Sequence, residues 1–388
     1  MLGATTRTRE PFEHQVALTG VGEFVAASDR PSSWARMATS ASARAIDDAG
    51  LTDADIEGVC VCDGSRGLPG LSEHGVRGLE QEFRLRPVWH SGSRTGGRIG
   101  AVVDAMLAVA AGLCRHVLCV SVSMSARAPR HRCDAMANPQ CHCSTGAQWA
   151  ARASADYLAT FGYARAALGW VAISARRHAA RNPDAVERAP LGMAEYLAST
   201  VACASLRERD FAMPRSEATA VIVSAASETA GRAVWVDAVG ARQRAAVNTA
   251  SDSRGHLDGF LPAAKQMWER TALTPGEIDF VALDDSSTFN VLCWLEALEF
   301  CRRGEGAAFA RGASRIGPGG ELPVNPHGGG LAGGGGSALF GMREAIVQLR
   351  GQSGARQIPD ARVAVVSSGT FDSNSALILT NSRPRQGF

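Results

Sequence analysis

The stretch from Gly317 to Gly351 reads GPGGELPVNPHGGGLAGGGGSALFGMREAIVQLRG, and the expected fold can be built outward from it. Its first half is rich in glycine, and a glycine lets a ligand or a neighbouring strand approach the backbone closely. Its second half has apolar residues at helical spacing, namely Leu339, Met342, Ala345, Ile346 and Leu349. A glycine loop that opens onto a helix can stabilise a phosphate or an oxyanion. The alternative is a tight turn, buried for packing reasons alone.

Composition and charge are those of a globular protein that stays in solution. The 388 residues are 45% hydrophobic and 20% charged, with a net charge of +2. This balance predicts no nucleic-acid partner and no membrane partner. The longest apolar stretch, residues 101–114, is too short to span a bilayer. The N-terminus lacks the apolar core of a signal peptide, so we expect a cytoplasmic protein.

The ten cysteines show no framework spacing. A chain of this length does not need disulfides, which also favours a reducing cytoplasm. Cys133, Cys141, His142 and Cys143 cluster on one loop and raise the question of a metal. No second pair at zinc-ligand spacing accompanies them, so we expect free loop thiols and no metal site.

One sequence pattern occurs twice. Residues 49–59 read AGLTDADIEGV and residues 272–281 read ALTPGEIDFV. In both, a helix ends, Leu-Thr begins a turn, and an acidic-Ile-acidic run leads into a strand. A helix followed by an apolar strand also recurs, over residues 95–121 and again over 336–367. Two α/β halves in the same element order predict a duplicated five-layer α/β/α/β/α sandwich, each half with a mostly parallel sheet.

Residues 124–214 interrupt this rhythm. We expect residues 1–123 to form the first part of the N-terminal half, 124–214 a helical insert, and 215–388 the C-terminal half. Helices are expected over 147–161, 164–182 and 193–200, and a strand at 219–223 is expected to start the sheet of the second half. Long excursions from an α/β frame usually shape a pocket or a subunit contact.

Five local runs are the most specific in the sequence: FGY at 161–163, WVA at 170–172, RHAARNP at 177–183, LEFCRRGEG at 298–306 and LPVNPHGG at 322–329. Together with the repeat and the insert, they resemble the thiolase superfamily, and more narrowly its sterol-carrier and lipid-transfer branch. The resemblance implies a pocket for a coenzyme A thioester as substrate, with no other cofactor. It also implies carbon–carbon bond chemistry beside the thioester carbonyl, and a homodimer formed through the edge of the first-half sheet.

The catalytic residues of that family are replaced here. Ser93 stands where the resemblance implies a nucleophilic cysteine, and Gly335 where it implies an activating histidine. Ser367 stands for a second cysteine and Asp284 for an asparagine. Ordinary thiolysis is therefore not expected. Some members of the branch are retro-aldol lyases that use tyrosines near these positions and a small zinc-ribbon/OB-fold partner, but this chain has no tyrosine at position 284 or 335.

Several groups remain able to act on a ligand. His327, beside the glycine blocks, is a candidate base near neutral pH, the alternative being a turn histidine bonded to nearby backbone. Asp284 is a candidate acid/base and is preferred to Asp285, because neighbours in a strand point to opposite faces. Ser93 is a candidate nucleophile only if a base lies in reach. The expected substrate-binding positions are Gly328, Gly329, Gly335, Ser367 and Gly369. The backbone N–H groups of residues 93 and 369 match an oxyanion hole of the family.

Two functions of different class follow. The first is an acyl-CoA enzyme of altered chemistry, an acyltransferase or a carbon–carbon lyase of retro-aldol or Claisen type. The second is a catalytically silent thiolase-like subunit that keeps the ligand pocket or the partner surface. The four replaced catalytic positions favour the second, whereas the insert and the glycine loops favour retained ligand binding, and of the two we prefer the first.

Overall fold

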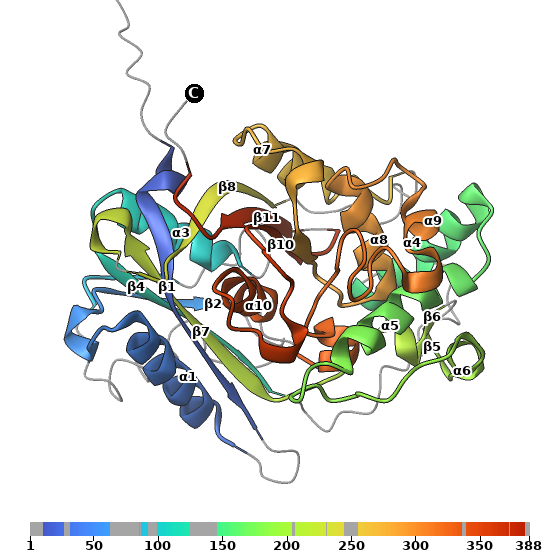
Figure 1. The fold of residues 1–388 in the computed structure, drawn as a ribbon, viewed down its shortest axis with the longest axis horizontal. Helices are drawn as coiled ribbons and strands as arrows, with labels where there is room; N and C mark the ends of the chain where they lie inside the picture. Colours follow the sequence, from blue (N-terminus) through green and yellow to red (C-terminus); the bar gives the residue numbers. More distant parts are fainter. Residues whose placement is uncertain are drawn as a thin grey trace, which may run out of the picture.

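The computed structural model describes residues 11–26, 32–62, 85, 87–91, 99–124, 146–203, 206–229, 231–243, 255–335, 339–371 and 373–384. Nine strands form one mixed sheet in the order β3-β2-β4-β7-β1-β8-β11-β10-β9, and helices cover both of its faces (Figure 1). The strands are β1 (Val16–Val25), β2 (Gly58–Cys62), β3 (Trp89–Ser91), β4 (His116–Ser123), β7 (Glu217–Ala225), β8 (Val234–Gln243), β9 (Phe280–Ala282), β10 (Val363–Gly369) and β11 (Ser373–Thr380). A separate short pair joins β5 (Val201–Cys203) to β6 (Leu206–Arg207).

The helices follow the predicted periodicity closely. They are α1 (Trp34–Ala49), α3 (Gly100–Ala110), α4 (Gly146–Phe161), α5 (Ala166–Ala179), α6 (Met193–Ala198), α7 (Leu261–Trp268), α8 (Thr288–Ala297), α9 (Gly306–Phe309) and α10 (Phe340–Leu349). Ser33 caps α1, since its Oγ accepts a hydrogen bond from the N–H of Arg36 at 3.2 Å. Gly112 and Gly351 follow α3 and α10 with φ of +76° and +70°, the left-handed conformation that glycine adopts at helix ends.

The repeated sequence pattern folds into a repeated structure. In the first copy, the N–H and the hydroxyl of Thr52 both donate to Oδ2 of Asp55, at 2.8 and 2.7 Å. In the second copy, the N–H and the hydroxyl of Thr274 donate to Oε2 of Glu277, at 2.9 and 2.8 Å. Each capped turn is a short 3-10 helix, η2 (Asp53–Asp55) or η6 (Pro275–Glu277), and each leads into a buried strand, β2 or β9. The same pair of hydrogen bonds therefore forms the same capped turn before a buried strand in both halves.

Alternating side chains divide the core into layers. On β4, Leu118, Val120 and Val122 pack in a cluster with α1. Val117 and Cys119 face the other way and share a second cluster with α3 and α10, to which β10 and β11 also contribute. The opposite faces of β10 and β11 pack in a third cluster with α5, α7 and α8. Helices therefore lie outside each half of the sheet and between the two halves, which is the predicted α/β sandwich. The expectation of mostly parallel sheets was wrong, because five of the eight strand pairs in the described part of the large sheet are antiparallel.

The two halves are joined by backbone hydrogen bonds. β1 pairs antiparallel with β8, at Ala17 with Trp235 and at Leu18 with Val234. We expected the strand near 219–223 to begin the second-half sheet, and this was wrong. β7 lies between β4 and β1 and pairs antiparallel with both, so it completes the first half. The order of apolar strands along the sequence does not specify which of them pair.

The helical insert is confirmed as helices within its described part. α4, α5 and α6 begin and end within a few residues of the predicted ranges. They lie on the same side of the molecule as α8 and α9, at the right in Figure 1. The division of the chain at residues 123 and 214 remains a prediction. No helix within the described residues is both long and apolar enough to cross a membrane.

The cysteines in the described regions are of two kinds. Cys60, Cys62, Cys114, Cys119, Cys293 and Cys301 are free thiols, whereas Cys203 is disulfide-bonded, which a reducing compartment does not favour. The loop cluster at 133–143 lies outside the described residues. No group of three potential metal ligands occurs among the residues that the structure describes.

Candidate functional site

Two loops meet where the parallel strands β9 and β10 end. Leu283 to Ser287 follows β9, and Ser367 to Gly369 forms the end of β10. β9 and β10 are paired in parallel register, so their carboxyl ends lie side by side at one edge of the sheet. The carboxyl ends of parallel strands are a common place for binding sites in α/β proteins.

Asp284 connects the two loops through its carboxylate. Its Oδ2 accepts a hydrogen bond from the N–H of Gly369 at 3.0 Å. Its Oδ1 accepts from the N–H of Ser286 at 3.0 Å and from the side-chain amide of Asn290 at 3.4 Å. Asp284 is half-buried, so its carboxylate is held in one orientation without being sealed from solvent.

Ser367 and Gly369 both form hydrogen bonds with Asp284. The hydroxyl of Ser367 accepts a hydrogen bond from the N–H of Asp284 at 3.2 Å. Gly369 has φ of +103° and turns tightly into β11, with its carbonyl held by the indole N–H of Trp294 at 3.3 Å. We expected the N–H of Gly369 to be open to a ligand oxyanion. In the structure, the carboxylate of Asp284 occupies that donor, so a ligand must compete with it.

Asp285 points away from its neighbour, as the alternation of strand residues predicts. It is buried, and its two oxygens accept hydrogen bonds from the N–H groups of Gly330 and Leu331 at 2.9 and 3.2 Å. Burial raises the pKa of Asp285 to about 7, although the two N–H groups act in the opposite direction. The side chain anchors the glycine loop to the end of β9.

The glycine loop folds as η8 (Gly329–Gly333), a turn of π-helix. A Cβ atom on Gly328 would lie 2.7 Å from the Cβ of Ala179, and one on Gly329 would lie 1.9 Å from Oδ2 of Asp285. The space left by these two glycines is therefore filled by α5 and by Asp285. At Gly328 and Gly329, the structure favours the packing interpretation over ligand contact.

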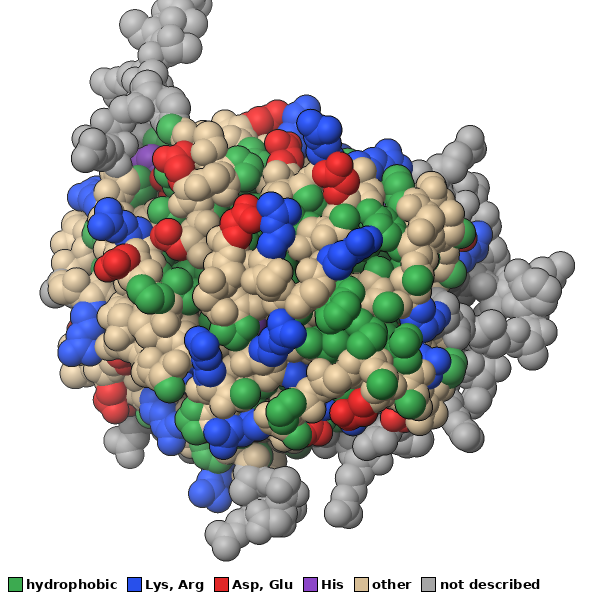
Figure 2. All heavy atoms as spheres, turned by 45° about the vertical axis from the view of Figure 1, so that its right-hand side comes forward, with side chains coloured by type: hydrophobic (Ala, Val, Ile, Leu, Met, Phe, Trp, Pro, Cys, Tyr) green, Lys and Arg blue, Asp and Glu red, His purple; other side chains and the backbone are tan. Residues whose placement is uncertain are grey.

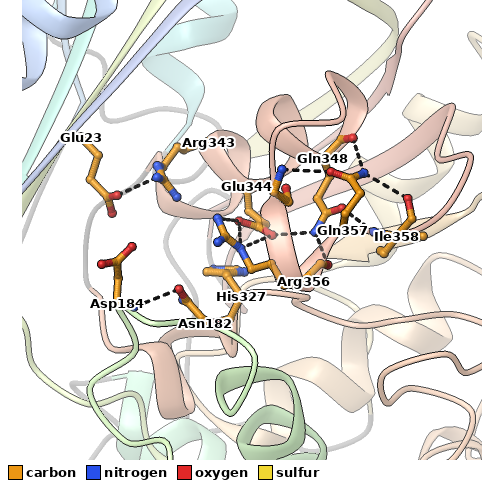
Figure 3. Close-up of polar contacts among 11 residues, drawn as sticks. Glu23, Asn182, Asp184, His327, Arg343, Glu344, Gln348, Arg356, Gln357 and Ile358 are labelled. Atoms are coloured by element: carbon orange, nitrogen blue, oxygen red, sulfur yellow. Dashed lines mark hydrogen bonds and ion pairs between the residues drawn. The ribbon is translucent and has the colours of Figure 1, made fainter.

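His327 is not placed to act as a base near neutral pH. It is 2% exposed, and burial lowers its pKa to about 3. Its ring packs edge-on against Phe340 at 4.3 Å between centroids, and neither ring nitrogen has a hydrogen-bond partner within the described part of the chain. Figure 3 shows the ring beside the ion pair of Glu344 and Arg356. This setting corrects the expectation of a base: the imidazole is uncharged and weakly basic.

The remaining predicted positions are Ser93 and Gly335. Ser93 lies outside the described residues, so its role as nucleophile stays a prediction. Gly335 lies near the end of the glycine loop, where its N–H donates to the carbonyl of Met213 at 3.2 Å. It has φ of +147°, a backbone conformation that disfavours any other residue.

The tyrosines of the insert are bound within the protein. Tyr157 donates to Oε1 of Glu296 at 2.7 Å, and Tyr196 donates to Oδ1 of Asp210 at 2.7 Å. Tyr163 donates to the carbonyl of Gly304 at 2.9 Å. Burial raises the pKa of Tyr157 and of Tyr196. The hydroxyls of Tyr157 and Tyr163 therefore join the insert to the rest of the chain, whereas that of Tyr196 bonds within the insert.

Sequence reasoning missed two residues that shape the site. Asn325 is buried, and its side chain accepts from the N–H of Leu283 at 2.8 Å and donates to the carbonyl of the same residue at 3.1 Å. Asn290, near the start of α8, reaches the carboxylate of Asp284. Asn325 lies between two prolines in the predicted loop. A polar side chain in a segment whose backbone is restricted by proline was the sequence signal that could have identified it.

The comparisons with known proteins agree with the fold. A family model described as thiolase C-terminal domain-like matches residues 241–381. An acetyl-CoA acetyltransferase of Methanothermobacter thermautotrophicus is 28% identical over 90% of this chain and 94% of its own length. A 17-hydroxy-3-oxo-4-pregnene-20-carboxyl-CoA lyase of Mycobacterium tuberculosis is 28% identical over 94% of this chain and 99% of its own length.

Among solved structures, the Ltp2-ChsH2(DUF35) aldolase superposes with a TM-score of 0.84 and 26% identity, covering 96% of this chain and 99% of that one. Whole-chain relatives, the family model and the fold agree with the five sequence runs that carry the resemblance. The chain is therefore similar to thiolase-superfamily proteins over nearly its whole length, and residues 241–381 match the thiolase C-terminal model.

Proposed function

We propose that this protein binds a coenzyme A thioester and cleaves the carbon–carbon bond beside the thioester carbonyl, as a lyase of retro-aldol type. The relatives named for lyase and aldolase activity support this reaction class. The observation that carries the proposal is the orientation of Asp284. A half-buried carboxylate, fixed by Gly369 and Ser286, lies at the carboxyl ends of two parallel strands, a common place for binding sites in α/β proteins.

The proposed step requires a base, and Asp284 is the candidate. Its carboxylate takes the proton of a hydroxyl on the carbon β to the thioester carbonyl. The bond between the α- and β-carbons breaks, the β-carbon becomes a ketone or aldehyde, and the electron pair passes to the thioester as an enolate. A proton added at the α-carbon completes a shortened acyl-CoA. No oxidant is needed, and coenzyme A enters as part of the substrate.

The experiment uses 17-hydroxy-3-oxo-4-pregnene-20-carboxyl-CoA, the compound in the name of the mycobacterial relative, as the probe. Mass spectrometry follows release of the ketone and the shortened acyl-CoA in equal amounts. We expect cleavage by the wild type and a rate about 100-fold lower for Asp284→Asn, because a general base contributes roughly 10²–10⁴ in rate. Equal rates for both proteins would remove Asp284 from the reaction.

One observation favours the second candidate, a silent subunit that binds ligand or partner. The N–H of Gly369 is already bonded to Asp284, so a potential oxyanion donor is occupied by a negatively charged group. A silent subunit predicts binding of acyl-CoA without turnover. Calorimetry beside the cleavage assay distinguishes the two candidates.

A partner protein and a second copy of the chain belong to the same proposal. The aldolase structure is titled as Ltp2 with ChsH2, and a small zinc-ribbon/OB-fold protein is the proposed partner here. Figure 2 shows hydrophobic side chains gathered on part of the face turned forward, with charges of both signs around them.

β3 is the edge strand of the first half of the sheet, and Val88 just before it is 76% exposed. We propose a homodimer through this edge, located in the cytoplasm, and light scattering tests its mass.

A further inference from the structure

A second carboxylate lies against the glycine loop from the opposite half of the sheet. Glu217 is the first residue of β7, in register with Ser123 at the end of β4 and with Val25 at the end of β1. It is completely buried, whereas buried carboxylates are rare in a strand packed on both faces. Its position at a strand end, next to a loop, points to a function beyond filling the core.

Glu217 faces the bare backbone of Gly335. A Cβ atom added at Gly335 would lie 2.9 Å from Oε1 of Glu217 and 3.1 Å from Cδ1 of Phe340. The carboxylate thus occupies the region into which any side chain at position 335 would extend. The family resemblance implies a histidine at that position, and here β7 supplies a carboxyl group to the same region.

The segment that leads into β7 is fixed along the glycine loop. Met213 donates its N–H to the carbonyl of Gly330 at 2.8 Å and accepts from the N–H of Gly335 at 3.2 Å. Arg215 donates from Nη1 to the carbonyl of Gly333 at 3.0 Å. The backbone is held at Met213, four residues before Glu217, and the side chain of Arg215 adds a bond two residues before it, so the start of β7 has a defined position relative to the loop.

The glycine loop also links Glu217 to the first carboxylate pair. Gly330, at the start of the loop, donates to Asp285, which directly follows Asp284. A Cβ atom on Gly330 would lie 3.1 Å from Oδ1 of Asp285 and 3.5 Å from the carbonyl oxygen of Gly335. Carboxyl groups from both halves therefore converge on the two ends of one short loop.

Arg215 can compensate the charge that Glu217 carries once it has given up its proton. Nε of Arg215 lies 3.8 Å from Oε2 of Glu217, and both side chains are almost fully buried. An interior carboxyl group beside a guanidinium can be maintained in a folded protein, whereas removing one partner leaves a buried charge. The 3.8 Å separation is longer than a hydrogen bond, so the guanidinium does not clamp the carboxyl group.

We propose that Glu217 transfers the proton at the α-carbon of the bound thioester, and this rests on the proposed lyase function. In the cleavage direction, Asp284 takes the hydroxyl proton and the bond between the α- and β-carbons breaks. The carboxyl group of Glu217 then gives its proton to the α-carbon of the enolate, yielding the shortened acyl-CoA. Asp284 ends with one proton more and Glu217 with one fewer, and a net transfer of one proton from Asp284 to Glu217 restores both. No redox step is involved.

The test isolates this half of the reaction. Propionyl-CoA in D₂O exchanges its α-hydrogens only if the protein removes and returns a proton there, and mass spectrometry detects the gain in mass. We expect exchange with the wild-type chain, a rate at least about 100-fold lower for Glu217→Gln, and a smaller loss for Glu217→Asp. Glu228→Gln, an exposed glutamate beyond the other end of β7, is the matched control and should exchange at the wild-type rate.

Two measurements, the folded state of each variant and the pH dependence of its exchange rate, distinguish a chemical role of Glu217 from a structural one. Each variant is compared by circular dichroism and melting temperature. If Glu217→Gln does not fold, the Glu217→Asp variant carries the test, and a change in the pH profile of its exchange supports a proton-transfer role. An unchanged exchange rate in folded Glu217→Gln overturns the proposal. So does the absence of exchange in wild type at propionyl-CoA concentrations where calorimetry detects binding.

The two proposals can fail separately. Exchange that depends on Glu217, without cleavage of the hydroxylated substrate, supports the role of Glu217 and rejects the lyase. Cleavage at equal rates in wild type and Glu217→Gln supports the lyase and rejects the role of Glu217.

Discussion

The backbone N–H of Gly369 donates to Oδ2 of Asp284 at 3.0 Å, so the end of β10 and the loop after β9 are joined by a side chain. This bond fixes the carboxylate proposed as the base, and it also occupies a donor that a substrate oxyanion could use. Changes at Asp284 therefore have two separable effects, on proton transfer and on access to the donor.

Replacing Asp284 by alanine should separate these effects. The variant loses the carboxylate but frees the N–H of Gly369, so we expect cleavage to fall by about 100-fold or more while the Kd for an acyl-CoA falls. Asp284→Asn keeps an acceptor for Gly369 and should lose cleavage without gaining affinity. Calorimetric titration of both variants provides the measurement, and equal Kd values for the two would contradict the idea that the donor is blocked.

Asp285 should make stability depend on pH in a defined direction. Its pKa is about 7 in the folded protein, against an ordinary value of 3.8. The folded state therefore holds this proton more tightly than the unfolded chain, and its contribution to stability is full below about pH 4 and lost as the pH rises to about 7. The free energy of unfolding of wild type, minus that of Asp285→Asn, should decrease over this interval. A difference that stays constant from about pH 4 to about pH 7 rules out the raised pKa.

His327→Phe tests the corrected role of the histidine. The imidazole is buried beside Phe340 and has no hydrogen-bond partner among the described residues, so an apolar ring of similar shape should not lower the melting temperature. We expect an unchanged or higher melting temperature, with cleavage within about threefold of wild type, since a general base would contribute far more. A folded variant that has lost cleavage would restore His327 as a functional residue.

Thiolysis should not be recovered by restoring the family's cysteine. Ser93→Cys gives a thiol that stays largely protonated near its usual pKa of about 8.5, because no activating histidine accompanies it. Adding Gly335→His and Ser367→Cys introduces a side chain at a backbone φ of +147°, against Glu217. We expect the triple variant to melt at a lower temperature and to remain inactive.

Loss of enolate absorbance from acetoacetyl-CoA provides the measurement, with the wild type and each single variant run in parallel. Rapid cleavage of acetoacetyl-CoA by the wild-type chain would show that the protein contains an activated nucleophile other than Ser93, and would overturn the proposed lyase.

Local features of the fold could be predicted because their signals lie within a few residues. The repeated Leu-Thr turn and acidic-Ile-acidic run identified the repeat, which the structure shows as the capping pairs Thr52–Asp55 and Thr274–Glu277, and apolar periodicity located the helices. Strand pairing could not be predicted in the same way. β7 and β8 are both apolar and close in sequence, yet one completes the first half and the other begins the second.

The candidate site was less accessible to prediction because its geometry depends on contacts between distant segments. The preference for Asp284 over Asp285 followed from the alternation of strand residues, and the two side chains do point to different partners. The occupation of Gly369 by Asp284 spans 85 residues of sequence and leaves no local trace. Glu217 offered a weak signal, an acidic residue at the start of an otherwise apolar strand.

The place of β1 in the middle of the sheet has a consequence for synthesis on the ribosome. β1 ends at Val25, but its partners are β7 and β8, which begin at Glu217 and Val234. At roughly 5–20 residues per second, β1 leaves the ribosome on the order of tens of seconds before either partner exists. The nascent chain must carry an apolar strand with two unpaired edges through that interval, which makes it a natural client for chaperones that shield such segments until the second half arrives.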